Sequence, residues 1–266
     1  MIHVAIVSHG HEDLLISSKI GGLQGVVGPL QVWLKDNKPS AKLKAYCQQN
    51  GVTYTDEKPG MGFGENNNFL FDLIKQKIGI TQNDSFVVMN PDLTIEPETL
   101  IQLIEQMQRD HAPLATLNLY RDSDYQLTDL NIRRFPDIFS VFRMLRTRSL
   151  TQTYDKTQIF TACEIDWASG ALLAFNANHY AALRGFDQHY FMYFEDVDLC
   201  YRSKKLCGAG VRYYPQLQAI HLAARQNRNL ISRHALWFIS SFMTFLSRRY
   251  FIYDRQPQLP VSQKTH

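Results

Sequence analysis

The sequence has few cysteines and no long hydrophobic run. Its four cysteines, Cys47, Cys163, Cys200 and Cys207, form no CxxC pair, so no zinc ribbon or redox dithiol is indicated. A membrane-spanning helix needs about 18 uninterrupted apolar residues, and no such run occurs. Residues 1–8 lack the basic and long apolar regions of a secretory signal. We therefore expect reduced thiols and a cytoplasmic location.

An excess of charge of one sign is also lacking. The 266 residues include 28 Lys and Arg against 25 Asp and Glu, a formal net charge of +3. This balance argues against a dedicated nucleic-acid binder but suits an enzyme that handles anionic diphosphates. A hydrophobic share of 45% excludes a disordered chain. With no repeat and no low-complexity linker, the chain is expected to form one domain with a C-terminal appendage.

Short apolar runs alternate with helical patterns along the chain. This alternation predicts an α/β fold, with a mostly parallel sheet and helices on both faces. Ser40 is a predicted helix N-cap, and Pro97 fits the first turn of a helix because its missing N–H costs nothing there. Strands are predicted at Ile2–Val7, Leu30–Leu34, 52–55, Phe86–Met89, Leu114–Leu119, Ala171–Phe175 and Val211–Tyr214. Helices are predicted at 40–49, 66–77, 97–108, 139–145, 176–184, 195–208 and 229–250.

Polar clusters fall at the carboxyl ends of predicted strands, where ligands bind in open parallel sheets. Asp36-Asn37 follows the second strand, Asn90-Pro91-Asp92 follows 86–89, and His221 lies beyond 211–214. A further cluster, 195–198, opens a helix. Each alone has an ordinary explanation: a turn capped by Ser40, a second turn, a core histidine, and acidic residues that stabilise a helix N-terminus.

Taken together and in order, these motifs resemble the bacterial family 2 glycosyltransferases with the GT-A fold, especially the rhamnosyl- and galactofuranosyltransferase-like branch. The resemblance covers about residues 2–225, and the last two stretches are the most specific. The matching stretches are Ile6-Val7-Ser8-His9, Lys35-Asp36-Asn37 with Ser40, Gly62-Phe63-Gly64-Glu65-Asn66-Asn67, Asn90-Pro91-Asp92, Asp166-Trp167-Ala168-Ser169-Gly170-Ala171, Gly185-Phe186-Asp187 and Phe191-Met192-Tyr193-Phe194-Glu195-Asp196-Val197-Asp198-Leu199-Cys200, with His221 closing the set.

The resemblance implies a catalytic domain over 1–225, with a nucleotide-sugar-binding half (1–110) and an acceptor half (111–225), followed by a helical extension (226–266). It implies an inverting transfer from a nucleoside-diphosphate sugar, dTDP-rhamnose or a UDP-hexose, to a saccharide acceptor that is lipid-linked. The setting would be bacterial surface-polysaccharide synthesis, such as that of O-antigen, on the inner face of the cytoplasmic membrane.

The family's metal site maps onto Asp92 and His221. A hard divalent cation, Mn²⁺ or Mg²⁺, would neutralise the leaving diphosphate, and oxygen and imidazole ligands suit it. Asn90 stands where the family more often has an aspartate. This change removes one negative charge and weakens the expectation of tight metal binding without nucleotide.

The resemblance assigns the general base to Asp196, which would take the proton of the acceptor hydroxyl. The neighbouring charge of Glu195 is expected to raise the pKa of Asp196. Glu195 itself would orient the substrate, and Asp198, two residues on, is interpreted as structural.

Asp36 corresponds to the aspartate that binds the base or ribose of the donor. Gly62-Phe63-Gly64 would let the backbone approach a ligand, and Asn66-Asn67 would begin a helix that faces the donor. Arg225 and Arg228 would clamp phosphate oxygens, although surface arginines explain them equally well. The complete predicted donor set is Ser8, His9, Asp36, Asn37, Gly64, Asn67, Asn90, Arg225 and Arg228.

Asp166 and Trp167 are the predicted acceptor-binding residues. The ring of Trp167 would offer an aromatic face to a sugar, and a core tryptophan is the alternative. A metal pair of His9 and His11 is less favoured, because that stretch lies where the nucleotide should bind.

The C-terminal segment is basic and apolar. From 222 to 250 it has five arginines and no acidic residue. A helical stripe there would pack on the domain, pack on a second subunit in a homo-oligomer, or lie on an anionic membrane surface through 229–250. The stripe comprises Leu236, Ile239, Phe242, Met243, Leu246 and Tyr250.

Two other functions stay open at this point. A sugar-1-phosphate nucleotidyltransferase would need a basic, glycine-rich loop after the first strand, where this chain has Ser8-His9-Gly10-His11-Glu12. A non-catalytic saccharide-binding protein would need neither Asp92 nor Asp196.

Overall fold

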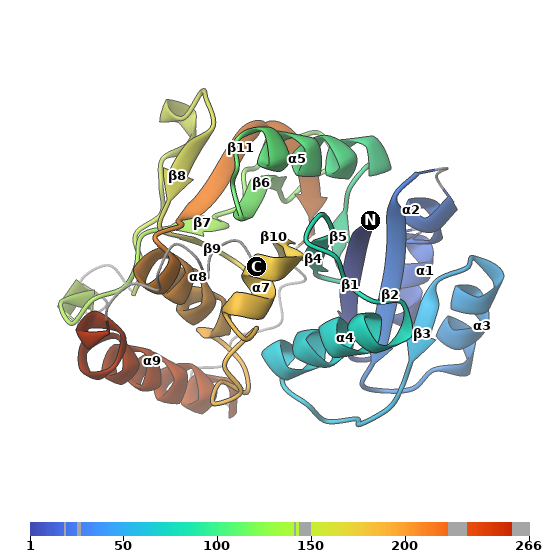
Figure 1. Ribbon diagram of the computed structural model, residues 1–266, viewed down its shortest axis with the longest axis horizontal. Coiled ribbons are helices and arrows are strands. Elements are labelled where there is room, and N and C mark those ends of the chain that lie inside the picture. The colour runs from blue at the N-terminus through green and yellow to red at the C-terminus, as the bar shows by residue number, and fades with distance from the viewer. Residues whose placement is uncertain (19, 26–27, 141, 144–149, 223–232, 257–266) are drawn as a thin grey trace.

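The structure is a computed structural model that describes residues 1–18, 20–25, 28–140, 142–143, 150–222 and 233–256 (Figure 1). A nine-stranded sheet runs through this described part. Along its main path the order is β3 (Thr53–Thr55), β2 (Leu30–Asp36), β1 (Ile2–Ser8), β4 (Ser85–Met89), β10 (Leu172–Asn176), β6 (Leu114–Tyr120), β11 (Val211–His221) and β5 (Leu93–Thr94), with β8 (Cys163–Ile165) also paired to β11.

The predicted mostly parallel sheet is confirmed, with an antiparallel strand at its centre. β3, β2, β1 and β4 are parallel to one another, and β6 and β11 run the same way. β10 lies antiparallel between β4 and β6, and β5 and β8 are antiparallel to β11. A two-stranded sheet pairs β7 (Ile132–Arg133) with β9 (Trp167–Ala168).

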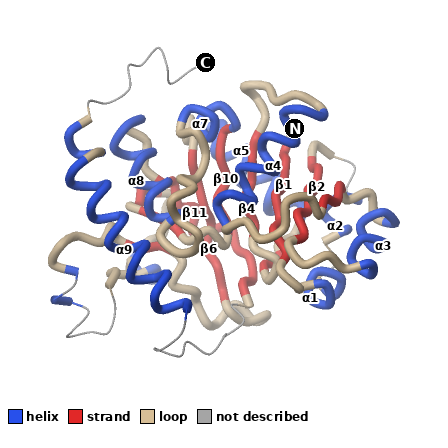
Figure 2. The backbone as a smooth tube through the Cα atoms, turned by 90° about the horizontal axis from the view of Figure 1, so that it is seen from below, coloured by secondary structure: helices blue, strands red, loops and turns tan. Residues whose placement is uncertain are grey.

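Helices cover both faces of the sheet, because its central strands are apolar on both sides (Figure 2). Along β4, Phe86 and Val88 enter one core, while Val87 and Met89 enter the other. The first core includes α4 (Phe63–Lys77), α7 (Ala177–Ala182), α8 (Glu195–Cys207) and α9 (Arg233–Phe251). The second includes α1 (Glu12–Ser17), α2 (Gly21–Gly25), α3 (Ala41–Gln49) and α5 (Pro97–Arg109). Two 3₁₀ turns lie at Lys156–Gln158 and Tyr253–Arg255.

Local sequence signals explain several helix ends. The Ser40 side chain accepts a hydrogen bond from the Leu43 N–H at 3.2 Å and caps α3, as predicted. Pro97 occupies the first turn of α5, also as predicted. The helix predicted at 176–184 is α7, Ala177–Ala182, with Asn176 as its N-cap. In the helix predicted at 139–145, residues 140, 142 and 143 are helical, and 141 and 144–145 lie outside the described residues.

Three of the predicted boundaries were wrong, and packing explains two of them. β2 continues through Asp36, because Asp36 pairs with Ser8 at the buried end of the sheet. α4 begins at Phe63 rather than at Asn66. β11 does not end at Tyr214: it passes Pro215 through a register shift between Tyr214 and Gln218 and reaches His221. Such bulges absorb a proline that cannot donate to the ladder.

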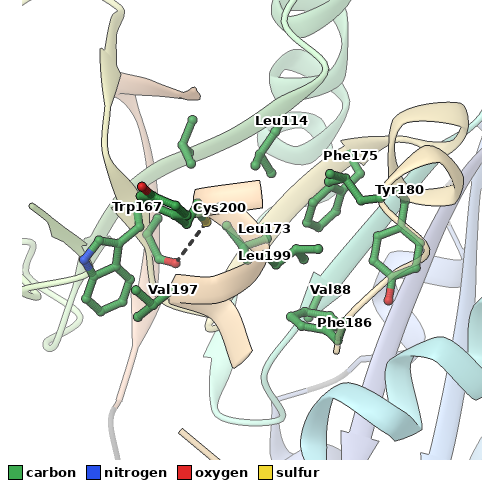
Figure 3. Packing of buried hydrophobic residues seen from close by; sticks show 14 of the residues in the cluster. Val88, Leu114, Trp167, Leu173, Phe175, Tyr180, Phe186, Val197, Leu199 and Cys200 are labelled. Carbon is green, nitrogen blue, oxygen red and sulfur yellow. Dashed lines mark hydrogen bonds between the residues drawn. The ribbon is translucent and has the colours of Figure 1, made fainter. Parts of the chain in front are cut away.

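The first turns of α8 are anchored in the core beneath the site. Figure 3 shows Leu199 and Cys200 of α8 packed among Leu173 and Phe175 of β10. Cys200 lies with its thiol 4.0 Å from the carbonyl oxygen of Ala168. Because these side chains are fully buried, α8 is fixed relative to the sheet.

A buried ion pair fixes the rest of α8. Asp198, with no exposed surface, accepts a hydrogen bond from Arg202 Nε at 2.7 Å and further bonds from Tyr190 and Tyr253. Arg202 also donates to the carbonyl oxygens of Leu183 and Gly185. Every polar group of the pair is therefore satisfied, and the structural interpretation of Asp198 is confirmed.

We expect Asp198→Ala to lower the free energy of unfolding by about 3–5 kcal/mol, because it leaves the Arg202 guanidinium buried without its carboxylate. Urea denaturation followed by circular dichroism measures this change. Asp72→Ala on the exposed face of α4 is the matched control and should change stability by less than about 0.5 kcal/mol. Equal stabilities of the two variants would contradict the assignment.

Candidate active site

A strained turn places the acidic pair at the start of α8. Tyr193 and Phe194 have φ angles of 69° and 65°, in the left-handed region that non-glycine residues avoid. The Phe194 ring is held by three rings of α9, with centroid distances of 5.3 Å to Phe238, 5.5 Å to Phe242 and 6.0 Å to Phe245. The turn therefore depends on packing against α9, and strain of this kind is concentrated at functional sites.

The two carboxyl groups that follow lie in different environments. Asp196 accepts hydrogen bonds from the backbone N–H groups of Gly170 at 3.0 Å and Val197 at 2.8 Å. Glu195 is buried, and among the described residues its Oε2 has no hydrogen-bond partner. One group is thus stabilised as a carboxylate at the helix N-terminus, while the other is desolvated.

Burial raises the pKa of both groups. For Glu195 the pKa lies well above the usual range, because of burial first and the charge of Asp196 second. For Asp196 burial also raises the pKa, while the hydrogen bonds from Gly170 and Val197 oppose the rise. The predicted rise at Asp196 is therefore present, but its main cause is burial rather than the charge of Glu195. Of the two, Asp196 is the one poised to be ionised.

A second group of polar side chains is centred on His221. β5 and β11 pair Leu93 with His221, which brings Asp92 Oδ1 to 3.3 Å from His221 Nε2. The other ring nitrogen, Nδ1, lies 2.6 Å from Asp129 Oδ2. Asn90 Nδ2 lies 3.5 Å from Nε2. Asp92 and His221, predicted to act together, are thus in contact.

Opposing influences set the pKa of His221. Burial lowers it, but the hydrogen bonds and charges of Asp129 and Asp92 outweigh burial and raise it to about 9. Asp129 is in turn 3.3 Å from Arg121 Nη2. The imidazole is therefore held between two carboxylates, one of which is balanced by an arginine.

The chemistry of this donor set fits a divalent cation. A carboxylate oxygen and an imidazole nitrogen face each other, and a second carboxylate fixes the far side of the ring, as around many metal-binding histidines. Within the described residues no cluster of three or more His, Cys, Asp or Glu side chains forms a metal site. Asp92 and His221 would thus supply two ligands, and the remaining ligands would come from outside the described residues.

The acidic pair and the His221 group meet at one segment. Gly170 N–H holds Asp196, and the next residue, Ala171, accepts a hydrogen bond from Asn90 N–H at 2.9 Å. Ser169 N–H donates to the carbonyl oxygen of Asn131, which is two residues from Asp129. Residues 169–171 therefore connect the two groups directly.

The predicted donor residues lie at the carboxyl ends of β1 and β2. Asp36 is buried and accepts hydrogen bonds from the N–H groups of Lys38 and Ser40 and from the Tyr54 hydroxyl, each at 3.2 Å. Ser8 is paired in register with Asp36, and its carbonyl oxygen accepts the Asn37 N–H. Much of the Asp36 carboxylate is thus used to order its own loop, which is the turn-forming role that the sequence left open.

The segment 8–11 links this end of the sheet to Asp92. The backbone N–H of His9 donates to His11 Nδ1 at 3.0 Å. Burial lowers the pKa of His11, and the charges of Asp92 and Asp36 oppose this effect. His11 therefore lies close enough to both predicted subsites to be influenced by each.

Gly62 and Gly64 pack against neighbouring segments of the chain. A Cβ on Gly64 would lie 2.6 Å from Phe186 Cβ, and one on Gly62 would lie 2.3 Å from the Phe191 carbonyl oxygen. These contacts explain the glycines by packing between α4 and the segment before α8. Asn67 donates to the Phe63 carbonyl oxygen, and its own buried Oδ1 has no partner in the described part. The side-chain amide of Asn37 donates to the carbonyl oxygen of Met61. The predicted ligand contacts of Asn37, Gly64 and Asn67 stay predictions.

The predicted acceptor role of Trp167 does not fit its position. Trp167 is only 6% exposed, its Nε1 donates to the carbonyl oxygen of Arg134, and the Arg133 guanidinium lies 5.7 Å from its ring centroid. Little ring surface remains for a sugar, which favours the core alternative, and the acceptor role of Trp167 stays a prediction. Asp166 accepts the Phe135 N–H at 2.9 Å and lies 3.6 Å from Lys204 Nζ, and its acceptor role stays a prediction.

Two predicted donor residues cannot be placed, and one hollow of the surface is distinct from the site. Arg225 and Arg228 are outside the described residues. A surface hollow of about 780 Å³ opens at the other end of the strands, near Ser85, Pro113 and Asn176, and the described residues that line it include no predicted site residue. This hollow is therefore not the predicted site.

Sequence reasoning missed Asp129 and Arg133. Asp129 holds His221 from 92 positions away, and the Arg133 charge lowers the pKa of Asp196 from 63 positions away. Neither residue belongs to a motif of the resemblance. The only available signal was their position in the polar stretch after the strand that ends at Tyr120.

Comparisons with known proteins give a consistent result, although no protein-family model matches the chain. The chain is 32% identical over 257 residues to rhamnosyltransferase WbbL of Escherichia coli K12, covering 96% of both chains. It is 27% identical over 182 residues to the N-acetylglucosaminyl-diphospho-decaprenol L-rhamnosyltransferase of Mycobacterium tuberculosis, covering 66% of this chain and 59% of that one.

The fold is also that of known glycosyltransferases. The mannosyltransferase PcManGT of Pyrobaculum calidifontis, solved with GDP-Man and Mn²⁺, matches with a TM-score of 0.59 at 12% identity, over 99% of this chain and 66% of that one. Neither a nucleotidyltransferase nor a non-catalytic saccharide-binding protein is supported by these likenesses. With 32% identity across nearly its whole length, the chain belongs to the rhamnosyltransferase-like family 2 glycosyltransferases.

Proposed function

We propose that the chain transfers a sugar, with inversion, from a nucleoside-diphosphate sugar to a lipid-linked saccharide on the cytoplasmic face of a bacterial membrane. The donor is dTDP-rhamnose or a UDP-hexose, and the product belongs to a surface polysaccharide. Residues 1–110 form the nucleotide-sugar half and 111–225 the acceptor half. Homo-oligomers are compatible with this function but are not required by it.

The relatives support the substrate classes. Two are named as rhamnosyltransferases, and the name of the mycobacterial one includes a diphospho-decaprenol acceptor. The structural neighbour from Pyrobaculum calidifontis was solved in complex with GDP-Man and Mn²⁺. The observation that supports the proposal is that segment 169–171 bonds both to Asp196 and to Asn90, whose side chain lies 3.5 Å from the His221 ring that contacts Asp92.

Asp92 and His221 would hold Mn²⁺ or Mg²⁺ beside the diphosphate. When bound, the cation neutralises charge that develops on the leaving nucleoside diphosphate. Asp129 accepts the Nδ1 proton of His221 and so keeps Nε2 directed toward Asp92. Asn90 contributes no charge, so the diphosphate would supply the negative charge that these two residues do not.

Asp196 would act as the general base on the acceptor hydroxyl. Its two backbone hydrogen bonds fix the carboxylate, and its raised pKa moves it toward a working range for proton transfer. Glu195, with a higher pKa, would stay protonated and donate a hydrogen bond that orients the acceptor.

We expect Asp196→Asn to fold normally and to bind nucleotide, but to lower kcat by about 10²–10⁴-fold, because proton removal from the acceptor is lost. Nucleotide release from dTDP-rhamnose and UDP-hexoses, with acceptor and Mn²⁺ present, measures kcat. Asp72→Asn on exposed α4 serves as control. Near-normal turnover of Asp196→Asn would remove this residue from the mechanism.

We expect Asp92→Ala to weaken Mn²⁺-dependent binding of UDP or dTDP by at least about tenfold, because a charged ligand is removed. Isothermal titration with and without Mn²⁺ separates the metal-dependent part of the affinity. Asp124→Ala, at an exposed loop position, should leave both affinities unchanged. A loss of metal-independent affinity alone would argue against Asp92 as a ligand.

Metal binding should depend on pH through His221. Because its pKa is about 9, the ring carries two protons near neutrality, and the cation must displace one of them. Affinity for Mn²⁺ in the presence of UDP should therefore rise with pH, by up to about tenfold per unit, and level off above about pH 9. The affinity at each pH can be measured by electron paramagnetic resonance, which reports the concentration of free Mn²⁺.

In Asp129→Asn this pH dependence should move to lower pH, since the charge that raises the pKa of His221 is gone. At high pH the variant should still bind Mn²⁺ about 10–100-fold more weakly, because the ring is no longer oriented. Asp124→Asn is the control from the same loop. A variant profile identical to that of the wild type would exclude the positioning role of Asp129.

A further inference from the structure

The outer face of α9 is apolar and exposed to solvent. Leu236, Ile239, Met243 and Phe251 are each between 58% and 70% exposed. Their spacing places them along one side of the helix. From 234 to 247 the sequence contains no Asp, Glu, Lys or Arg, although a helix face in contact with water normally carries charge. We call these four residues the α9 outer face.

The opposite side of α9 is already committed to the protein. Phe242, Phe245 and Leu246 are buried in the core that includes α8. The helix is therefore docked on one side, and the α9 outer face lies outside this core. No helix among the described residues is long and apolar enough to span a bilayer, so a membrane contact of α9 would be along its side.

A second apolar segment, residues 136–140 with 142–143, adjoins the last turn of α9. Arg249 Nη1 donates to the carbonyl oxygen of Pro136 at 2.6 Å, and the Ile138 N–H donates to the Tyr250 hydroxyl at 3.3 Å. Figure 1 shows this segment beside the C-terminal end of α9. Its exposed apolar side chains are Ile138, Phe139 and Phe142.

The sequence around both surfaces is basic. Residues 138–154 contain three arginines and residues 222–253 contain five, and neither stretch has an aspartate or glutamate. Among the described side chains, the exposed Arg255 guanidinium lies 5.6 Å from the Phe251 ring centroid. An apolar face within a basic region is complementary to an anionic lipid surface, where acyl chains and headgroups supply both interactions.

We propose that the α9 outer face and the adjoining segment dock onto an anionic lipid surface. The choice of lipid rests partly on the proposed function, since a lipid-linked acceptor lies in a membrane. A second copy of the chain fits less well. In a two-fold dimer the same patch meets itself, so the two arginine-rich stretches, which contain no acidic residue of their own, would each meet a like-charged stretch.

Docking of this kind would bring residues 191–194, which precede Glu195 and Asp196, close to the membrane. Ser241 of α9 donates to the Met192 carbonyl oxygen at 2.9 Å, and the Tyr193 hydroxyl lies 3.1 Å from His234 Nδ1. The rings of Phe191 and Trp237 are 4.9 Å apart. The residues just before Glu195 are thus fixed to the inner side of the helix whose outer face contacts lipid.

Flotation of the full chain with vesicles tests the proposal. Binding is expected to vesicles of mixed phosphatidylglycerol and phosphatidylethanolamine, and to be much weaker with phosphatidylcholine alone. Ile239→Glu combined with Met243→Glu should reduce partitioning by about tenfold or more, since two apolar contacts are replaced by charges that anionic lipid repels. Ile78→Glu, at a similarly exposed apolar position after α4, should not change it.

Light scattering of the same proteins without vesicles completes the test, and a monomeric mass is expected for all of them. A wild type that does not float, a double variant that floats like the wild type, or a dimer that the double variant dissociates would each overturn the proposal. Turnover of nucleotide-sugars is measured in a separate assay with a water-soluble acceptor, so that enzymatic activity is tested independently of lipid binding. Vesicle binding without turnover would refute the proposed function and leave the lipid surface standing.

Discussion

The left-handed turn at Tyr193 and Phe194 is the constraint on which the arrangement of the site depends. Each residue is held in a conformation that costs about 1–2 kcal/mol, and the surrounding packing must supply that energy. The aromatic rings of α9 supply it by enclosing Phe194. Because Glu195 and Asp196 follow at once, the direction of both carboxyl groups is set by a helix about 40 positions later in the chain.

This dependence gives α9 two roles that a single helix can combine. Its inner face stabilises the turn, and its outer face is available to a surface. Under the proposed function, the base has to stay at a constant height above the lipid headgroups, and a rigid helix between the two would achieve this without a hinge. Loss of the inner packing would release the turn and with it the hydrogen bond from Gly170 to Asp196.

Local chemistry made much of the fold predictable, because apolar runs, the Ser40 cap and Pro97 act over a few residues. Motif order also pointed to Asp92 and His221, which the β5–β11 pairing brings into contact. The rest depended on tertiary packing. Pro215 signalled a strand end that a bulge bypasses, and Asp129 meets His221 only once two distant strands are adjacent. The burial of Trp167 could not be predicted either, because the same local sequence fits a tryptophan in the core and a tryptophan that stacks on a sugar.

The charges around His221 explain why this site would need its nucleotide. Asp129 is balanced by Arg121 at 3.3 Å, and Asp92 faces an imidazole that is itself cationic near neutrality. Asn90 adds no charge. The protein alone therefore offers a dication almost no net negative charge, and a cation would have to displace a proton to bind. A diphosphate supplies the missing charge, so cation and donor would be expected to bind together rather than in sequence.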